Sequence, residues 1–474
     1  MYTITKTIKT INMEEIPEAV KRCFRLFKVY QHETYLVGGS VRDMLLEKTP
    51  EDWDIAANAS VDEIVKICQN VFKTSVYKTR WQTVRIQDVT EPNISIEITP
   101  YKYGNDLYTD LLHRDFTMNA IAVDDSGNFY DPFGGREDLE NSRLKFTNGD
   151  IIERVNEDPL RLLRMLRFLR EFHLTLDADL KKVNQLYPLL DNIKPERIFP
   201  ELCKFLLVKR KNKFDAFQDI ICFKDIICAA VPELKVCEGY NVGLYQTQSD
   251  DLYRVIMKNI DIYTGDDIIL KLALLFHDVA KPYVAEHQFS QCDKINEYFN
   301  HKYRSADMAN LRLLQFRCSN KIRNCVVELI KYQDNFVKPN KKSIRKLIHK
   351  LGIDQAKRLI LFQDLITHFG ENNVSSTLLE KTHDAKFIFY ELEADYYNHI
   401  GVFNIKDLNI NGYDLLNMGF KENHLIGVIL RHILNAVLEE KIENTYEDCV
   451  NMAKLLKNVY EKSGKIPYHV TFEK

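Results

Sequence analysis

The strongest candidates for chemistry in this sequence are two aspartates, Asp52 and Asp54, separated by a single residue. In an extended strand, residues two apart project from the same face, so both carboxylates can reach one hard cation. Carboxylates this close repel each other unless a divalent ion neutralises them, and Mg²⁺ completed by substrate phosphates and water is the usual ion. By itself an Asp-x-Asp is more often a solvated turn, so the interpretation depends on the residues around it.

The preceding run, Leu36-Val-Gly-Gly-Ser-Val-Arg-Asp43, supports the metal interpretation. Gly38 and Gly39 fall between a predicted strand and a predicted helix, where missing side chains let backbone N–H groups and a helix N-terminus approach an anion. A lone Gly-Gly is more often only a tight turn. With Arg42 one turn into the helix and two carboxylates beyond it, the pair predicts a phosphate site.

A small mixed α/β domain is predicted to position these residues. Strand-like segments are short, rich in β-branched residues and concentrated before residue 135, with a helical pattern at 61–71 between them. Only 17 glycines and 13 prolines in 474 residues, with 45% hydrophobic residues, favour long helices and argue against a collagen-like, disordered or all-β chain. The predicted strands are 35–37, 54–56, 83–86, 94–98 and 120–123.

After residue 151 the pattern becomes helical and stays so. One predicted helix carries an apolar and a basic stripe, formed by Leu160, Leu163, Leu166 and Leu169 and by Arg161, Arg164, Arg167 and Arg170. Further helices are predicted at 196–208, 267–276, 321–332, 343–350 and 424–439. We therefore expect an α+β chain with a small mixed α/β head at 1–150, then an all-α neck at 151–215, body at 216–340 and tail at 341–474.

Charge and hydropathy limit the partners and the compartment. Lys+Arg 65 against Asp+Glu 68 gives a formal charge of -3, so no global field indicates nucleic-acid binding and any basic surface must be local. The ten cysteines include no C-x-x-C pair, which favours reduced thiols. No stretch of about 18 apolar residues occurs. We expect a cytoplasmic protein without a membrane partner.

The motifs resemble those of class II tRNA nucleotidyltransferases, the CCA-adding enzyme and bacterial poly(A) polymerase family of the polymerase β superfamily. Weaker similarity continues to the C-terminus, including 404–414. Besides the Gly-Gly and Asp-x-Asp motifs, the matching segments, in the expected order, are Arg114-Asp-Phe-Thr-Met-Asn119, Asp131-Pro-Phe-Gly-Gly135, Glu157-Asp-Pro-Leu-Arg161-Leu-Leu-Arg164 and Pro195-Glu-Arg-Ile198.

The resemblance implies template-independent, Mg²⁺-dependent nucleotidyl transfer, adding C and A from CTP and ATP to the 3′ end of tRNA. Asp52 and Asp54 would be catalytic and hold the metal. Glu97 is a weaker candidate for a third carboxylate, because a Glu at a strand end is usually solvated. The residues implied in binding nucleotide phosphates and sugar are Gly38, Gly39, Arg42, Arg114, Asp115 and Asn119.

The helix after residue 157 is implied in choosing the base, through Asp158, Arg161, Arg164 and Arg167. A carboxylate accepts from the exocyclic amine of C or A, and an Arg donates to the neighbouring ring nitrogen. UTP and GTP place a carbonyl oxygen there, so the same Asp would repel them. Without the family motif, a solvated, salt-bridged stripe would be the default, and we keep that interpretation for Arg170.

Two departures from the family leave the product and a second activity open. Family members that add all of CCA usually hold a longer loop rich in Arg and Pro before the Arg114 motif, whereas segment 98–113 has 16 residues, one Pro and no Arg. A CC-only product is therefore an alternative. His277-Asp278 resembles an HD phosphohydrolase core with His301 and Asp334 as partners, but the other expected histidine positions read Lys258-Asn259 and Tyr332-Gln333. A helix-packing remnant is the favoured interpretation.

Three rival functions remain: a poly(A) polymerase, an HD-type phosphohydrolase with an inactive head, and a non-catalytic RNA-binding protein. A poly(A) polymerase would favour a strongly basic C-terminal extension, which 466–474 lacks. Intact Asp52 and Asp54 argue against the other two. The helical remainder should bind tRNA by shape and backbone through local basic patches, or else present a solvated charged face. The best cluster is Lys338, Lys341, Lys342, Arg345, Lys346 and Lys350.

Overall fold

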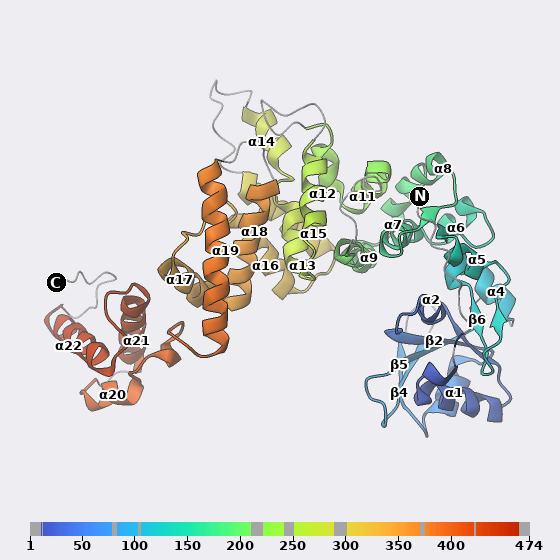
Figure 1. Cartoon of the computed structure of the whole chain (residues 1–474), viewed down its shortest axis with the longest axis horizontal. Helices are drawn as coiled ribbons and strands as arrows, with labels where there is room; N and C mark the ends of the chain where they lie inside the picture. The colour runs from blue at the N-terminus through green and yellow to red at the C-terminus, as the bar shows by residue number, and fades with distance from the viewer. Residues whose placement is uncertain are drawn as a thin grey trace. The chain divides into compact units, whose positions relative to one another are not determined.

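The structure, a computed structural model, divides into two compact units, Met1–Pro232 and Glu233–Lys474 (Figure 1). The finer division of the chain into four parts at residues 150, 215 and 340 remains a prediction. The residues that the structure describes are 11, 13–77, 83–102, 106–209, 221–240, 251–288, 301–369, 375–420 and 423–463.

The head contains one seven-stranded mixed sheet with strand order β3-β4-β5-β2-β1-β6-β7. Strands β2 and β5 pair in parallel, and the other neighbours pair antiparallel. The strands are β1 (Thr34–Val37), β2 (Asp52–Ala57), β3 (Lys73–Tyr77), β4 (Thr83–Gln87), β5 (Ser95–Pro100), β6 (Ala122–Val123) and β7 (Phe129–Tyr130).

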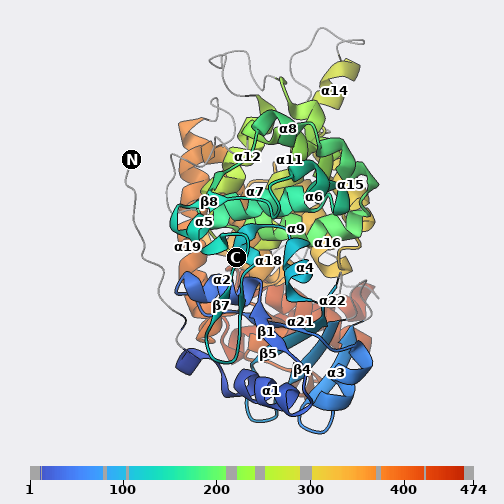
Figure 2. The same ribbon diagram turned by 90° about the vertical axis from the view of Figure 1, so that its right-hand side faces the viewer.

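The two faces of this sheet have different roles. Trp53 and Ile55 of β2 are 3% and 1% exposed on the face against which the helices pack, and full burial of each such side chain stabilises the fold by about 1.5–3 kcal/mol. Helices α1 (Glu18–Val29) and α3 (Val61–Cys68) cover that face (Figure 2). Because side chains alternate along a strand, Asp52 and Asp54 are left on the opposite face.

Several short elements lie between the strands of the head and before the longer helices that follow. A second pair of strands, β8 and β9, is parallel, and the first turns of several helices are capped by aspartates: Asp106 caps α4 and Asp150 caps α6. The elements are η1 (Met13–Glu15), α2 (Gly39–Leu45), α4 (Leu107–Leu112), η2 (Thr117–Asn119), α5 (Gly135–Glu140), β8 (Arg143–Leu144) and β9 (Thr175–Leu176).

The rest of the first unit is helical. The predicted two-stripe helix is α7, but its basic stripe is not a solvated face, because Arg161 and Arg170 are 7% and 4% exposed. Arg170 stacks its guanidinium over Phe205 of α9, 4.6 Å from the ring centre. The helices are α6 (Ile151–Glu157), α7 (Arg161–Glu171), α8 (Leu180–Asn184), η3 (Tyr187–Asn192), α9 (Pro195–Leu207) and α11 (Lys224–Ala230).

The second unit is helical throughout its described residues. Helix α13 is buried on all sides from Ile269 to Phe276, as expected for the central helix of a bundle. The elements are η4 (Pro232–Cys237), which spans the unit boundary, α12 (Leu252–Ile262), α13 (Ile268–Phe276), α14 (Lys281–Gln288), α15 (His301–Gln315), α16 (Asn320–Lys331), α17 (Lys341–Leu351), α18 (Ile353–Phe369), α19 (Ser376–Tyr397), η6 (Ile405–Asp407), α20 (Gly412–Asn417), α21 (Asn423–Leu438) and α22 (Tyr446–Ser463).

The α+β class is confirmed, and so are the predicted strands and helices, within a few residues at their ends. Strand β3 was not predicted, because its sequence Lys73-Thr-Ser-Val-Tyr77 lies at the sheet edge and shows no clear alternation. The two-residue strands are too short to leave a pattern. Within the described ranges, no helix combines the length and the apolar character needed to span a bilayer.

Candidate active site

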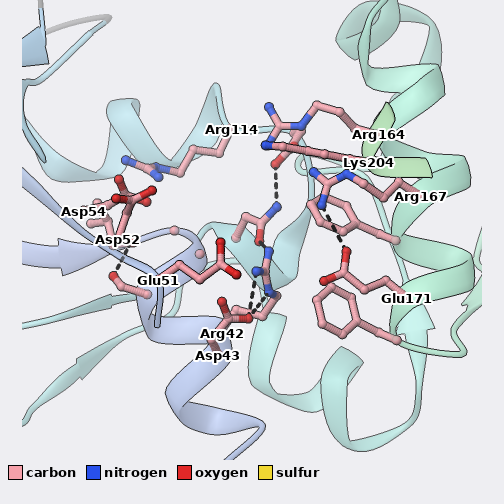
Figure 3. A pocket seen from close by; sticks show the side chains of 18 of the residues that line it. Arg42, Asp43, Glu51, Asp52, Asp54, Arg114, Arg164, Arg167, Glu171 and Lys204 are labelled. Atoms are coloured by element: carbon pink, nitrogen blue, oxygen red, sulfur yellow. Dashed lines mark hydrogen bonds and ion pairs between the residues drawn. The ribbon is translucent and has the colours of Figure 1, made fainter. Parts of the chain in front are cut away.

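A cavity of about 1700 Å³ in the first unit contains every residue predicted for the site (Figure 3). Asp52, Asp54 and Arg114 lie on one side of it, and Arg164 and Arg167 lie across from them. The predicted residues in its wall are Gly38, Gly39, Arg42, Asp52, Asp54, Arg114, Asp115, Asn119, Asp158, Arg161, Arg164 and Arg167.

The Gly-Gly turn joins β1 to α2 at the cavity wall. Gly38 is the N-cap of α2 with φ +71°, a left-handed conformation that glycine adopts without strain. A Cβ at Gly38 would lie 2.8 Å from Nη1 of Arg114 and 3.4 Å from Oδ2 of Asp54. A side chain at this position would therefore displace Arg114. Glycine leaves the space that the Arg114 guanidinium needs beside the turn.

The aspartate pair lies on β2 as predicted, with both carboxylates lining the cavity. Glu97 is the parallel neighbour of Asp54 on β5, so a third carboxylate faces the same cavity. Arg85 of β4 donates to Glu97 through Nε at 3.1 Å, which neutralises much of its charge. A metal-binding role for Glu97 stays a prediction.

Electrostatics around the pair favour a bound cation. Burial raises the pKa of Asp54 to about 6; Glu97 and Asp52 add to the rise and Arg114 opposes it. Two nearby arginines are committed to other carboxylates, Arg42 to Asp43 at 2.8 Å and Arg114 to Asp110 at 3.0 Å. Carboxylate oxygens that lie this close together repel one another, and a hard divalent cation bound between them would relieve the repulsion.

A continuous chain of polar contacts runs across the cavity from Arg42 to Arg164 of α7. Arg42 donates through Nη1 to Oδ1 of Asn119 at 2.9 Å, and Nδ2 of Asn119 donates to Asp115 at 3.0 Å. The other oxygen of Asp115 forms an ion pair with Arg164 at 2.8 Å. Burial alone would raise the pKa of Asp115, but Arg164 and Asn119 outweigh it and the pKa is lowered.

The Asp131 motif positions this chain from outside the cavity. Asp131 accepts from the backbone N–H groups of Gly135 and Arg136 at 2.8 and 2.9 Å, which fixes the start of α5. A Cβ on Gly135 would lie 2.1 Å from the carbonyl oxygen of Thr117, so only glycine lets α5 pack against η2. Because η2 carries Asn119, this packing sets the position of the Asn119 amide.

The predicted base-reading residues differ in how far contacts within the protein leave their side chains able to bind a base. Asp158 lines the cavity and accepts from Nη2 of Arg197 with both oxygens, at 3.2 and 3.1 Å. Arg164 is partly exposed, at 36% of its side chain. Arg167 contacts Glu201 and Glu171 at 3.0 and 3.1 Å. Asp158 and Arg164 are therefore best placed to meet a base.

Arg161 is held by the protein itself. It donates through Nη1 to the carbonyl oxygen of Arg154 at 2.7 Å and to Glu157 at 2.8 Å, and through Nη2 to the carbonyl oxygen of His113 at 2.6 Å. The side chain is 9% exposed. These contacts join the neck to the end of α4, and base reading by Arg161 stays a prediction.

Sequence reasoning missed three contributors to the cavity. Phe168 and Phe172 form an aromatic wall, with the Arg42 guanidinium 5.1 and 4.7 Å from their ring centres. Arg197 lies within a motif that the sequence singled out without assigning it a role. Phe172 lies one position beyond the end of α7, which could have indicated it; only the fold places it beside Arg42.

Two segments of the chain match known protein families. Residues 34–145 match the family described as poly(A) polymerase head domain, and residues 300–453 match the one described as tRNA nucleotidyltransferase domain 2, putative. Both matches agree with the resemblance to class II tRNA nucleotidyltransferases that the motifs predicted, and that resemblance is confirmed.

Curated relatives that the chain resembles include the CCA-adding enzyme of Anoxybacillus flavithermus, 38% identical over 196 residues, or 38% of this chain and 48% of that protein. The CC-adding tRNA nucleotidyltransferase of Shouchella clausii is 39% identical over 176 residues, covering 37% and 44% of the two chains. The CCA-adding enzyme of Oceanobacillus iheyensis is 29% identical over 351 residues, covering 70% and 82%. The chain thus spans about half the length of the first curated relatives it matches.

The similarity to solved structures covers more of the chain than the sequence similarity to the first curated relatives does. The crystal structure of the Bacillus stearothermophilus CCA-adding enzyme in complex with CTP has a TM-score of 0.61 at 22% identity, covering 94% of this chain and 98% of that one. The Thermotoga maritima CCA-adding enzyme complexed with tRNA has a TM-score of 0.52 at 19% identity, covering 94% and 97%. At these identities the likeness shows the fold alone.

The segment before the Arg114 motif contains the end of a strand and a short helix. Of residues 98–113, β5 extends to Pro100 and α4 spans Leu107–Leu112, which leaves 101–106 between them. Residues 103–105 lie outside the described residues.

The HD-like residues form a compact charge cluster. Asp278 contacts Nε2 of His277 at 3.2 Å, Nε2 of His301 at 3.1 Å and Nζ of Lys281 at 2.8 Å. Burial alone would raise its pKa, but His277 and Lys281 outweigh burial and hold the pKa of Asp278 well below its usual range. Asp334 instead pairs with Lys302 at 3.4 Å. Asp334 therefore does not contact Asp278 in this cluster, and an inactive cluster stays our prediction.

The basic cluster of the second unit is partly neutralised. Lys341 pairs with Glu391 at 3.2 Å, Arg345 with Glu440 at 3.7 Å, and Lys346 with Glu439. Lys350 donates to the Tyr332 hydroxyl at 3.0 Å. These contacts favour the charged-face interpretation over a free RNA-binding patch, and tRNA contact here stays a prediction. Residues 466–474, the predicted discriminator from a poly(A) polymerase, lie outside the described residues.

Proposed function

We propose that this protein adds C and A to the 3′ end of tRNA without a template, using CTP and ATP, in the cytoplasm. The observation that carries the proposal is one cavity that holds a metal-fitting Asp52–Asp54 pair opposite Asp158 and Arg164. A transfer site and a base-reading site in the same cavity are what a protein-templated polymerase needs. The names of the curated relatives, CCA-adding and CC-adding, support the same reaction class.

Phosphate binding would fall to the Gly38 turn and Arg114. The open backbone at Gly38 and the Arg114 guanidinium beside it form a positively charged surface next to Asp54. Asp110, 2% exposed, orients Arg114 by accepting from its Nε and Nη2 at 3.3 and 3.0 Å. An arginine fixed in this way positions a triphosphate and stabilises its charge without reorganising during transfer.

Asp52 and Asp54 would hold Mg²⁺, with Glu97 as a neighbouring carboxylate. When bound, this ion would supply charge that favours ionisation of the RNA 3′-hydroxyl and neutralises the triphosphate. The protein's own contribution is to keep two carboxylates ionisable on one rigid strand. That strand is central in the sheet, so the pair cannot move independently of the cavity wall.

Base choice would depend on Asp158, Arg197 and Arg164. Arg197 orients the Asp158 carboxylate, so it can accept from an exocyclic amine and repel the carbonyl oxygen of U or G. Asp115 orients Arg164 in the same way, through an ion pair that is linked to Asn119 and Arg42. The nucleotide's sugar side and base side are therefore connected by fixed side chains.

Two alternative products remain within this chemistry. Segment 98–113 has only 16 residues, and a pocket that reshapes from C to A needs an element able to adopt a second arrangement, so a CC-only enzyme is one alternative. A poly(A) polymerase would use the same head. Neither alternative changes the role of the aspartate pair.

The test is to offer tRNA lacking its 3′ end with each labelled nucleotide singly and then CTP with ATP. We expect CTP to be incorporated, UTP and GTP to be rejected, and ATP to be added only after two C. Asp52→Ala should incorporate nothing while retaining the parent's circular dichroism spectrum. Equal use of CTP and UTP by the parent protein would refute the base-reading site, and an active Asp52→Ala would refute the transfer site.

A further inference from the structure

A second cluster of metal-ligating side chains lies in the other unit, between α18 and α19. Asp364 and His368 are four residues apart on α18, so both project from one face of the helix. His383 comes from α19. One ligand atom from each of the three lies within 4.8 Å of the others. None of these residues takes part in the proposed nucleotidyl transfer, whose residues all belong to the first unit.

The distances in this cluster agree with a small coordination sphere. Nδ1 of His368 and Nδ1 of His383 lie 3.2 and 3.8 Å from the same carboxylate oxygen, Oδ1 of Asp364. Ligands bound tetrahedrally at about 2.0 Å are separated by about 3.3 Å, so little movement would bring all three onto one Zn²⁺. Two imidazoles and one carboxylate are a donor set that suits zinc and similar transition metals.

The central carboxylate is buried and incompletely satisfied. Asp364 is 7% exposed, and its Oδ1 is a buried oxygen without a hydrogen-bond partner in the described residues. Its second oxygen contacts the ammonium of Lys386. A buried acceptor usually has a partner, so the oxygen that faces both imidazoles is the one expected to hold a cation.

Two contacts compete with a metal at this site. Nδ1 of His368 also lies 2.9 Å from the backbone carbonyl oxygen of Asp364, so in the metal-free protein this nitrogen carries a hydrogen that binding must release. Lys386 places a positive charge beside the carboxylate, which weakens the attraction for a second cation. The side chains of His368 and His383 are 32% and 47% exposed, so a metal ion can reach them from solvent.

We propose that Asp364, His368 and His383 form a binding site for a divalent transition metal such as Zn²⁺. Its role is structural, because it ties the last turns of α18 to the first turns of α19. The two helices already approach closely there, with the hydroxyls of Thr367 and Thr382 3.1 Å apart. Water completes the coordination.

The direct test is calorimetric titration of the full chain, freed of metal, with Zn²⁺ in the presence of excess Mg²⁺. Mg²⁺ occupies the hard oxygen site of the head, so the signal reports a site with nitrogen ligands. We expect one Zn²⁺ per chain. His368→Gln and His383→Gln should each weaken binding by more than about tenfold, since even outer contacts of a metal site are worth that much. The matched control His424→Gln, which changes a histidine exposed in the same unit, should leave the affinity unchanged.

A second variant should raise the affinity for Zn²⁺ and not lower it, and it removes none of the proposed ligands. Lys386→Gln should bind Zn²⁺ more tightly than the parent, because the competing ammonium is removed, and Zn²⁺ should raise the thermal midpoint of this variant and of the parent. Absence of Zn²⁺ binding by the folded parent would overturn the proposal. So would equal affinities of the parent and both histidine variants, or an affinity that Lys386→Gln leaves unchanged.

Discussion

Asp54 is the residue at which metal binding and protonation compete. Desolvation and the charges of Glu97 and Asp52 disfavour its ionised form, and Arg114 only partly compensates, so its pKa reaches about 6. The carboxylate is therefore largely ionised at neutral pH and largely protonated one unit below 6. A divalent cation needs the ionised form, so its affinity should depend on pH in this range.

We predict that Mn²⁺ binding to the head weakens by about tenfold for each unit by which the pH falls below about 6, and levels off above about 7. Titration calorimetry of the full chain at a series of pH values measures this, and Asp54→Asn identifies the signal that belongs to the pair. An affinity that stays constant across this range would show that Asp54 does not hold the metal.

Asp158 is the residue on which base discrimination should depend. Asp158→Ala removes the carboxylate that would repel the carbonyl oxygen of UTP, so the variant should incorporate UTP while retaining some transfer chemistry. The measurement is the ratio of CTP to UTP incorporation into tRNA lacking its 3′ end. Asp191→Ala, an exposed aspartate in the same helical region, is the control and should keep the parent's ratio. Strict rejection of UTP by Asp158→Ala would place base choice elsewhere.

At the scale of elements, the junction of α4, α6 and α7 depends on Arg161. Its guanidinium joins two backbone carbonyl oxygens and Glu157 in a largely buried position. Hydrogen bonds of a charged group contribute about 1.5–3 kcal/mol each, and removing the donor leaves buried acceptors unsatisfied. Arg161 is therefore as much a structural residue as a site residue.

We predict that Arg161→Met lowers the free energy of unfolding of the first unit by about 3 kcal/mol. Arg197→Met, at a half-exposed arginine with a single ion pair, should cost less than about 1 kcal/mol. Urea denaturation followed by circular dichroism gives both values. If the two substitutions proved equally mild, the anchoring role of Arg161 would be wrong.

The elements around the site could be predicted from sequence where the pattern was local. The Gly38–Gly39 turn, the Asp52–Asp54 strand and the α7 helix all carry their signals within a few residues, and each was found. The contacts that organise the site are not local: Asn119 meets Arg42 across 77 positions, and Arg197 meets Asp158 across 39. Such pairings depend on tertiary packing, so the burial of the basic stripe on α7 could not be read from its spacing.

For the whole molecule, the two units have separable chemistry. The transfer site lies entirely within the first unit, whereas the HD-like cluster lies in the second. The other positions expected to hold histidines in an HD site are Asn259 and Gln333, so the cluster lacks ligands. Substitutions in this cluster should therefore leave nucleotide addition unaffected.

We predict that His277→Ala leaves nucleotide addition largely unchanged at temperatures where the variant remains folded. Neither the parent nor the variant should hydrolyse 2′,3′-cyclic nucleotides in the presence of divalent metals. Assays of both activities on the same preparations measure this. A metal-dependent phosphatase activity present in the parent and lost in His277→Ala would contradict our interpretation of the cluster.

The central claim is that one cavity performs protein-templated addition to tRNA. The most direct measurement is to incubate tRNA lacking its 3′ end with the full chain, Mg²⁺, CTP and ATP, and to sequence the product ends. We predict ends of CCA from the parent protein and unextended tRNA from Asp54→Asn. A ladder that stopped at two cytidines would keep the transfer site and support the short-segment argument. Unextended tRNA from the parent, or long tracts of A, would contradict the account.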